Sequence, residues 1–350
     1  MTGAHCEAPS LRVNDLSVHF RTEDGVVRAV DRITFAALPG RTLGIVGESG
    51  SGKSVAALAI LGLHDPHHAT VTGEILVGGI NIVGMDDARV GRLRGREIAM
   101  IFQDPLSALH PYYTVGRQIS EAFRVHHPRA GRAETRRHAV DMLDRVGIPE
   151  PGKRFSNYPH EFSGGMRQRV MIAIALVNDP RLLIADEPTT ALDVTMQAQI
   201  LDLLTDLRQE FQAAVVVITH DFGVVSQVAD DVVVMYAGRI VESGTVDQVL
   251  RRPQHPYTWG LLASVPKLHG RHDGTLTTIP GSPPSLIDLP AGCAFHPRCK
   301  YQNRTGGRSR TELPELRTAT EPGHRVACHL AEEERKAIYA AEIAQSRAGQ

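Results

Sequence analysis

Long hydrophobic runs are missing from this sequence. The longest uninterrupted apolar stretches, such as 171–177 and 213–218, fall far short of the roughly 18 residues that a membrane-spanning helix needs. The opening stretch, MTGAHCEAPS, has no basic segment followed by an apolar one, so no export signal is expected. We therefore expect a chain that does not itself cross a membrane.

Cysteine is also scarce, with four residues in 350. Four are too few for a disulfide scaffold, which indicates a reduced, cytosolic protein. Three of them, Cys293, Cys299 and Cys328, lie near the C-terminus. We expect a local thiol site there.

Neither sign of charge dominates the chain. Its 38 Lys and Arg residues nearly balance 39 Asp and Glu residues, for a formal net charge of -1. A balanced chain has no global positive field, so we expect no nucleic-acid partner. Apolar residues at 42% and charged residues at 22% are typical of a globular protein. The length allows two domains, or one large domain with an extension.

The first strands and a glycine-rich loop predict an α/β nucleotide-binding fold. Residues 11–20 and 33–38 have strand composition, with the turn-like sequence TEDG between them. The apolar run LGIV at 43–46 enters a glycine-rich loop, and residues 55–63 have helical composition. Strand, glycine loop and helix in this order begin α/β nucleotide folds.

The rest of the chain predicts a helical insertion, a parallel sheet and a loop-rich tail. Apolar residues at helical spacing mark 114–146, and we place a helical subdomain at about 104–175 within a nucleotide-binding domain of residues 1–250. Continuous apolar strands indicate a sheet covered on both faces. They are expected at 182–186, 214–218 and 231–235, with a helix at 194–209 and a hairpin around Ala237 and Gly238. Residues 251–350 are rich in Pro and Gly at first, which predicts a separate extension with a helical or disordered end.

The segment GESGSGKS, from Gly47 to Ser54, matches the phosphate-loop pattern GxxxxGK[ST] in full. Its glycines let successive backbone N–H groups turn toward an anion at a helix N-terminus. Lys53 is expected along the β- and γ-phosphates, and the Ser54 hydroxyl on Mg²⁺. We expect a nucleoside-triphosphate site formed by Gly47, Ser49, Gly50, Ser51, Gly52, Lys53 and Ser54.

Two carboxylates end the apolar stretch LLIADE. Asp186 stands at the C-terminal end of a predicted strand, where open α/β sheets place ligands, and is a candidate to hold Mg²⁺. Glu187 is a candidate general base that takes a proton from the attacking water. The alternative is a pair of N-cap carboxylates for the following helix. The surrounding motifs decide in favour of the magnesium and base roles.

Four further motifs surround that strand: FQDP from Phe102, FSGGMRQR from Phe162, TALD from Thr190 and THD from Thr219. With the phosphate loop and the Asp-Glu strand, all in order, the chain over about residues 10–250 resembles the ATP-binding cassette (ABC) family. The resemblance implies an α/β P-loop NTPase cassette with a RecA-like core sheet, an antiparallel β subdomain and a helical insertion. It also implies that ATP and Mg²⁺ bind between two cassettes.

The resemblance assigns one group of residues to the junction between cassettes. Ser163, Gly164 and Gly165 form a helix N-terminus, which is an anion site that closes over the γ-phosphate bound by the other cassette. Asp193 orders the dimer seam.

A second group acts on the nucleotide held by this chain. Gln103 is implied to reach the metal and the attacking water, and His220 to bond the γ-phosphate and hold the water in line. For His220 the alternative is one of 17 ordinary histidines on a solvated surface. Phe20 aligns with the aromatic residue that stacks on adenine in the family, and the alternative is an ordinary buried strand aromatic.

Several stretches resemble the ATPase subunits of dipeptide and oligopeptide importers. They are GIVGESGSGKS, FQDPLSALHP, FSGGM, TTALDVTMQAQIL, HPYTWGLLASVP and IPGSPPSLIDLPAGCAFHPRC. The resemblance implies a prokaryotic subunit that is peripheral at the cytoplasmic face of the cell membrane. Its implied partners are a second homologous ATPase subunit (as a heterodimer), two membrane-spanning permease subunits and an external solute-binding protein. The alternatives are a related importer of nickel chelates, opines or other small solutes, a soluble ABC ATPase acting on ribosomes or DNA, and a non-catalytic regulatory cassette.

In related subunits the tail can carry four cysteines suited to an iron–sulfur cluster. Cys293, Cys299 and Cys328 match three of them, but the chain has no cysteine near Gly306, where the fourth is expected. Because cluster irons are normally held by four thiolates, a 4Fe-4S centre needs a substitute ligand. Candidate substitutes are His296, His324, His329 and the remote Cys6. The alternatives are a zinc site of three cysteines and one histidine, or three plain buried thiols.

Overall fold

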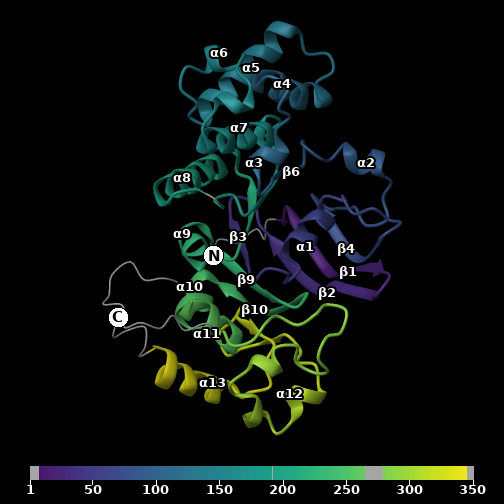
Figure 1. Cartoon of the computed structure of the whole chain (residues 1–350), viewed down its shortest axis with the longest axis vertical. Coiled ribbons are helices and arrows are strands. Elements are labelled where there is room, and N and C mark those ends of the chain that lie inside the picture. Colours follow the sequence, from purple (N-terminus) through teal and green to yellow (C-terminus); the bar gives the residue numbers. More distant parts are fainter. Residues whose placement is uncertain (1–7, 191, 265–278, 345–350) are drawn as a thin grey trace, which may run out of the picture.

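The computed structural model describes residues 8–190, 192–264 and 279–344, and two sheets organise them (Figure 1). An antiparallel sheet has the order β2 (Gly25–Ala37), β1 (Leu11–Thr22), β4 (Ala69–Val77) and β5 (Ile80–Asn81). A mixed sheet has the order β11 (Arg317–Thr318), β12 (Arg325–Val326), β10 (Arg239–Thr245), β9 (Asp231–Tyr236), β3 (Thr42–Val46), β8 (Ala214–Thr219), β7 (Leu182–Asp186) and β6 (Ile98–Ile101). Strands β9, β3, β8, β7 and β6 run parallel.

The central strands β3, β7 and β8 are buried at every position, as their continuous apolar sequences predict. Their alternate side chains enter two different cores. Ile184 and Val216 face α1 (Lys53–Ile60) and the antiparallel sheet, whereas Leu183 and Val215 pack against helices on the opposite face. The sheet is therefore the middle layer, and its strand ends carry the site.

The predicted helical insertion consists of several helices in the upper part of Figure 1. They are α3 (Pro105–Ala108), α4 (Val115–His126), α5 (Arg132–Arg145), α6 (Pro151–Arg154) and α7 (Gly164–Leu176). The run predicted at 114–146 is two helices, because the segment between α4 and α5 contains Pro128 and Gly131. The other helices of the cassette are α2 (Asp87–Gly91), α8 (Val194–Phe211), α9 (Phe222–Val228) and α10 (Val246–Arg251).

The tail, expected as a separate loop-rich unit, adds strands to the main sheet. Glu242 of β10 pairs with Val326 of β12, and β11 pairs with β12 in turn. The helices of the tail are α11 (Pro256–Ala263), α12 (Arg308–Thr311) and α13 (Glu332–Ile338), followed by a π-helical turn at Tyr339–Ala344. Figure 1 shows this extension below β9 and β10. None of the helices that the structure describes is long and apolar enough to cross a membrane.

Candidate nucleotide-binding site

The phosphate loop lies between β3 and α1, as the sequence predicts, and two of its glycines are required by close backbone contacts. A Cβ atom at Gly47 would lie 2.2 Å from the carbonyl oxygen of Met235. At Gly52, whose φ is 101°, it would lie 2.3 Å from the carbonyl oxygen of Ala29. Larger residues at these two positions would push the loop away from β9 and β2, so the position of the loop requires glycine.

Lys53 is buried at the start of α1, and its ammonium group is held inside the loop. Its Nζ donates to the carbonyl oxygens of Gly47 (2.7 Å) and Glu48 (2.9 Å) and lies 3.3 Å from the hydroxyl of Ser51. Burial lowers the pKa of Lys53, and neighbouring carboxylates oppose that shift. The exposed rim of the loop consists of Ser49, Gly50 and Ser54.

Asp186 ends β7 with its side chain almost fully buried. Burial raises its pKa, and a hydrogen bond from Ser54 opposes that shift. Its Oδ1 is buried and has no hydrogen-bond partner among the residues that the structure describes. A buried oxygen without a partner is costly, and carboxylate and hydroxyl oxygens are the ligands that Mg²⁺ prefers. Asp186 and Ser54 therefore fit a magnesium ion.

Three side chains converge on the carboxylate of Glu187. Gln103 Nε2 donates to Oε2 over 2.9 Å, and the Thr190 hydroxyl donates to the same oxygen over 2.9 Å. His220 Nδ1 lies 3.0 Å from Oε1. Glu187 has a left-handed backbone with φ at 47°, and its N–H donates to the carbonyl oxygen of Ile218. The sequence-predicted Gln103, Glu187 and His220 thus form one cluster.

The environment keeps Glu187 ionised. Burial is the largest single influence and raises the pKa of this carboxyl, but the hydrogen bonds from His220 and Thr190 and the charges of His220 and Lys53 together outweigh it. The net result is a pKa below the usual range of a glutamate. Glu187 is therefore a carboxylate at neutral pH and is able to accept a proton.

The signature motif lies at the start of α7, where Ser163 and Gly164 are exposed and Gly165 is buried. Ser163 caps α7 and accepts from the N–H of Met166 at 3.4 Å, while Asp193 caps α8. Gly165 lies so close to α8 that a Cβ would meet Met196 Cε at 1.9 Å. Within the described part of the chain, no hydrogen bond or ion pair joins this motif to the phosphate loop, and α7 lies well apart from α1 (Figure 1). Ala191, in the TALD motif, lies outside the described residues.

Phe20 lies on β1 and is partly buried. Its ring meets that of His64 edge to face, with centroids 5.3 Å apart, and packs against the core between the two sheets. It is thus a strand aromatic that retains exposed surface.

The three tail cysteines line one cavity of about 20 Å³, together with His296 and His329. Such a cavity has room for roughly one water molecule. Burial raises the pKa of Cys293 to about 11 and of Cys299 to about 12. Burial also raises the pKa of Cys328.

These residues do not fit a 4Fe-4S cluster. No group of three or more His, Cys, Asp or Glu side chains is arranged to hold a metal ion in the described ranges. The candidate fourth ligand His324 instead lies 2.8 Å from the buried carboxylate of Glu242. Cys6 lies outside the described residues. The structure therefore supports neither the cluster nor the zinc interpretation.

Three contributors to the site were missed by sequence reasoning. Thr190 belongs to a motif that was noticed, but its bond to Glu187 was not predicted. Tyr257 and Arg298 come from the extension and contact Glu48 in the phosphate loop. No local sequence pattern indicates these contacts, because Tyr257 and Arg298 lie more than 200 positions from Glu48.

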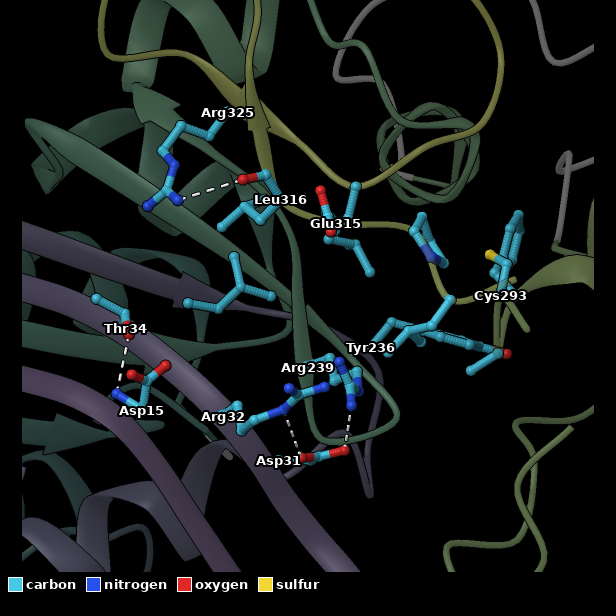
Figure 2. Close-up of a pocket in the computed structure, with 17 residues that line it drawn as sticks. Asp15, Asp31, Arg32, Thr34, Tyr236, Arg239, Cys293, Glu315, Leu316 and Arg325 are labelled. Carbon is cyan, nitrogen blue, oxygen red and sulfur yellow. Dashed lines mark hydrogen bonds and ion pairs between the residues drawn. The ribbon is translucent and has the colours of Figure 1, made fainter. Parts of the chain in front are cut away.

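A larger cavity of about 280 Å³ lies where the extension meets β1, β2 and β10 (Figure 2). Its charged side chains are largely paired within the wall. Asp31 pairs with both Arg32 and Arg239, and Arg325 donates to the carbonyl oxygen of Leu316. This cavity belongs to the seam between extension and cassette.

Comparison with known proteins identifies the class. Residues 30–190 match the family described as ABC transporter. A peptide import ATP-binding protein of Brucella abortus (strain 2308) is 50% identical over 322 residues, which cover 89% of this chain and 96% of that protein. The chain belongs to the ABC transporter family.

The closer resemblance concerns peptide transporters. Residues 241–305 match the family described as Oligopeptide/dipeptide transporter, C-terminal region. The oligopeptide transport ATP-binding protein OppD of Bacillus subtilis (strain 168) is 52% identical over 292 residues, which cover 83% of this chain and 81% of that protein. The predicted resemblance to this branch is confirmed.

Solved structures confirm the predicted cassette fold. A dimeric, post-hydrolysis structure of the ATP-binding cassette MJ0796 bound to ADP and Pi has a TM-score of 0.61 at 27% identity, covering 67% of this chain and 98% of that chain. CbiO1 of Clostridium perfringens, part of the ABC transporter complex CbiONQ, has a TM-score of 0.59 at 28% identity and covers 70% of this chain and 92% of that chain.

Proposed function

We propose that this chain is the ATP-hydrolysing subunit of an ABC importer for dipeptides and oligopeptides. The observation that carries the proposal is the 50% identity, along 89% of the chain, to a peptide import ATP-binding protein. The match of residues 241–305 to the oligopeptide/dipeptide C-terminal region supports the peptide branch. We place the boundary between the nucleotide-binding domain and the extension near residue 250.

The chemistry follows from the side chains around the loop. The backbone N–H groups of the loop and Lys53 bind the phosphates of ATP. Ser54, Asp186 and Gln103 hold Mg²⁺, which neutralises phosphate charge when bound. Glu187 accepts a proton from the attacking water, and His220 orients that water toward the γ-phosphate. The contacts that already join Glu187 to Gln103 and His220 support this division of roles.

We infer that the site is completed by another cassette. The N-terminus of α7 exposes Ser163 and Gly164 to ATP held by a partner, with Gly165 buried behind them, and Asp193 stands at the start of the neighbouring helix. The related MJ0796 cassette is dimeric. Phe20 retains exposed surface on which adenine can stack.

The proposed assembly contains a second, different ATPase subunit, two permease subunits and an external solute-binding protein. The chain then works as a peripheral protein at the cytoplasmic face of a prokaryotic cell membrane. A related importer for nickel chelates or opines is the second candidate, because the solute is selected by the other subunits.

Reconstitution in lipid vesicles tests the proposal. The chain, its partner cassette and the two permeases are assembled with the binding protein outside, and uptake of labelled dipeptide, nickel chelate and opine is compared. We expect ATP-dependent uptake of the peptide. Uptake of only a chelate or opine would reassign the solute, and co-sedimentation with ribosomes without permease binding would overturn the transport role.

A further inference from the structure

The extension holds the second residue of the phosphate loop. Arg298, in a 3₁₀ turn at His296–Arg298, donates from its two terminal nitrogens to Glu48 Oε2 (2.6 Å) and Oε1 (2.9 Å). The Arg298 side chain is 5% exposed. A bidentate guanidinium–carboxylate pair fixes both partners in orientation as well as position.

The backbone of Glu48 is held as well. Its N–H donates to the hydroxyl of Tyr257 over 2.8 Å, and its carbonyl oxygen accepts from Lys53 over 2.9 Å. Tyr257 is fully buried, and its ring packs against Tyr236 and Phe295 at centroid distances of 4.6 and 5.4 Å. Both main-chain polar groups of Glu48 are therefore committed before a nucleotide binds.

Arg298 is itself anchored in the extension. Its Nε donates to the carbonyl oxygen of Pro280 over 2.8 Å, and one terminal nitrogen lies 3.4 Å from the Tyr236 hydroxyl. The guanidinium thus connects the extension, β9 and the phosphate loop. A shift of the extension would be transmitted to the loop through this group and through the Tyr257 hydroxyl.

The pair also has an electrostatic effect, because Glu48 carries a negative charge near the phosphate loop. This carboxylate is close enough to the ammonium of Lys53 to influence it. An unpaired carboxylate there would repel the phosphates of a nucleotide and compete for Lys53. The guanidinium of Arg298 neutralises it.

We propose that Arg298 and Tyr257 are positioning residues for nucleotide binding. Both hold the phosphate loop in its binding conformation through Glu48, and Arg298 also neutralises the Glu48 carboxylate. The inference rests on the proposed ATP site. It makes the extension part of the nucleotide-binding apparatus, although neither residue touches the phosphates.

Titration of purified full-length chain with a fluorescent ATP analogue and Mg²⁺ tests the proposal. We expect Arg298→Ala to weaken binding about tenfold and Arg298→Lys less, since a misplaced loop and an added repulsion both act on the bound phosphates. Tyr257→Phe, which removes only the hydroxyl, should weaken binding without disturbing the aromatic packing. In the assembled ATPase the same variants should raise KM more than they lower kcat.

A matched control separates positioning from general destabilisation. Arg335 is another arginine of the extension with the same 8% residue exposure, and it donates to Gln254 and Leu330, away from the loop. Arg335→Ala should lower the melting temperature and leave nucleotide affinity unchanged. An equal loss of affinity in this variant would reduce Arg298 to a structural role.

A double variant also removes the charge that Arg298 neutralises. Adding Glu48→Gln to Arg298→Ala should restore part of the lost ATP affinity. If the two substitutions acted only by damaging the structure, their losses of ATP affinity would add instead. Absence of ATP binding by the wild-type chain would refute the proposed function itself. Wild-type binding with undiminished affinity in the Arg298 and Tyr257 variants would refute only this inference.

Discussion

At the scale of single residues, Glu187 is the best-defined group of the site. A left-handed backbone places it after β7, and three neighbouring side chains fix its carboxylate. Its lowered pKa suits proton acceptance at neutral pH but excludes service as a proton donor in that range. The residue is therefore prepared for one direction of proton transfer.

Replacing Glu187 by glutamine should separate binding from hydrolysis. Glu187→Gln keeps the hydrogen-bonding shape but removes the base, so we expect normal ATP affinity and a rate lower by about 10² to 10⁴. Turnover of the assembled transporter and nucleotide titration measure the two effects. Near-normal turnover would remove Glu187 from the role of base.

The pH profile reports on the same carboxylate. Because hydrogen bonds depress the pKa of Glu187, its active ionised form is lost only as the pH falls through that lowered value. Thr190→Val removes one donor, so the acid limb of the kcat/KM profile should move to higher pH. Thr205→Val, whose hydroxyl bonds Leu201 within α8, serves as control. An unmoved acid limb in Thr190→Val would show that another group sets it.

The cysteines give a prediction about metal content. The three thiols surround a cavity of about 20 Å³, which has room for roughly one water molecule, and no group of three or more ligands is arranged to hold a metal ion among the described residues. Anaerobically purified chain should contain no stoichiometric iron, sulfide or zinc and show no absorbance near roughly 400 nm. Stoichiometric iron and sulfide would mean that the tail rearranges around a cluster.

At the scale of elements, the start of α11 carries a buried histidine. His255 is 1% exposed, and its Nδ1 accepts from the N–H of Tyr257 over 3.1 Å. Burial, with the nearby charge of Arg335, lowers its pKa to about 3, although a bond involving Ala327 opposes the shift. The helix cap depends on a neutral imidazole, because a protonated Nδ1 cannot accept.

Folding stability should therefore fall in mild acid. In the unfolded chain His255 has a pKa of roughly 6.5, so below that pH it is protonated there but stays neutral in the native protein. The free energy of unfolding therefore decreases as the pH falls from about 6.5 toward about 3. His255→Asn keeps an acceptor for the cap but does not titrate. Urea unfolding should show that it loses less stability between neutral pH and mild acid than wild type, by on the order of 2 kcal/mol. His67→Asn, at an exposed histidine, is the control. If the free energy of unfolding fell equally with pH in wild type, His255→Asn and His67→Asn, the assignment to His255 would be contradicted.

Sequence patterns predicted those elements whose signal is local. The phosphate loop, β3, β7 and β8 were predicted because glycine spacing and continuous apolar runs are written in a few consecutive residues. β2 begins at Gly25, well before the predicted start, because the hairpin with β1 extends the pairing up to Thr22. Strands β11 and β12 have two residues each, too short for any periodicity.

Part of the site was also beyond sequence patterns. The cluster around Glu187 gathers residues from three separate segments, and only the family resemblance indicated that Gln103 and His220 meet it. The contact of Glu48 with Arg298 spans 250 positions and depends on how the extension docks. Three-dimensional packing, and not spacing along the chain, determines such contacts.

At the scale of the whole molecule, the phosphate loop and the N-terminus of α7 are separate and share no hydrogen bond within the described residues. Under the proposed function, each of them contributes to a different composite ATP site. We expect the purified chain to be a weak ATPase, with activity appearing when a second cassette and the permeases are added. Turnover measured against protein concentration checks this. Full activity of a monomer, independent of concentration, would exclude a composite site.

During synthesis of the chain, Glu48 is made long before its partner Arg298. At about 5 to 20 residues added per second, the 250 positions between them take roughly 12 to 50 seconds to translate. During that interval the loop and β3 exist on the ribosome while the anchor for Glu48 does not. Tight ATP binding is thus expected only after the extension has emerged and docked.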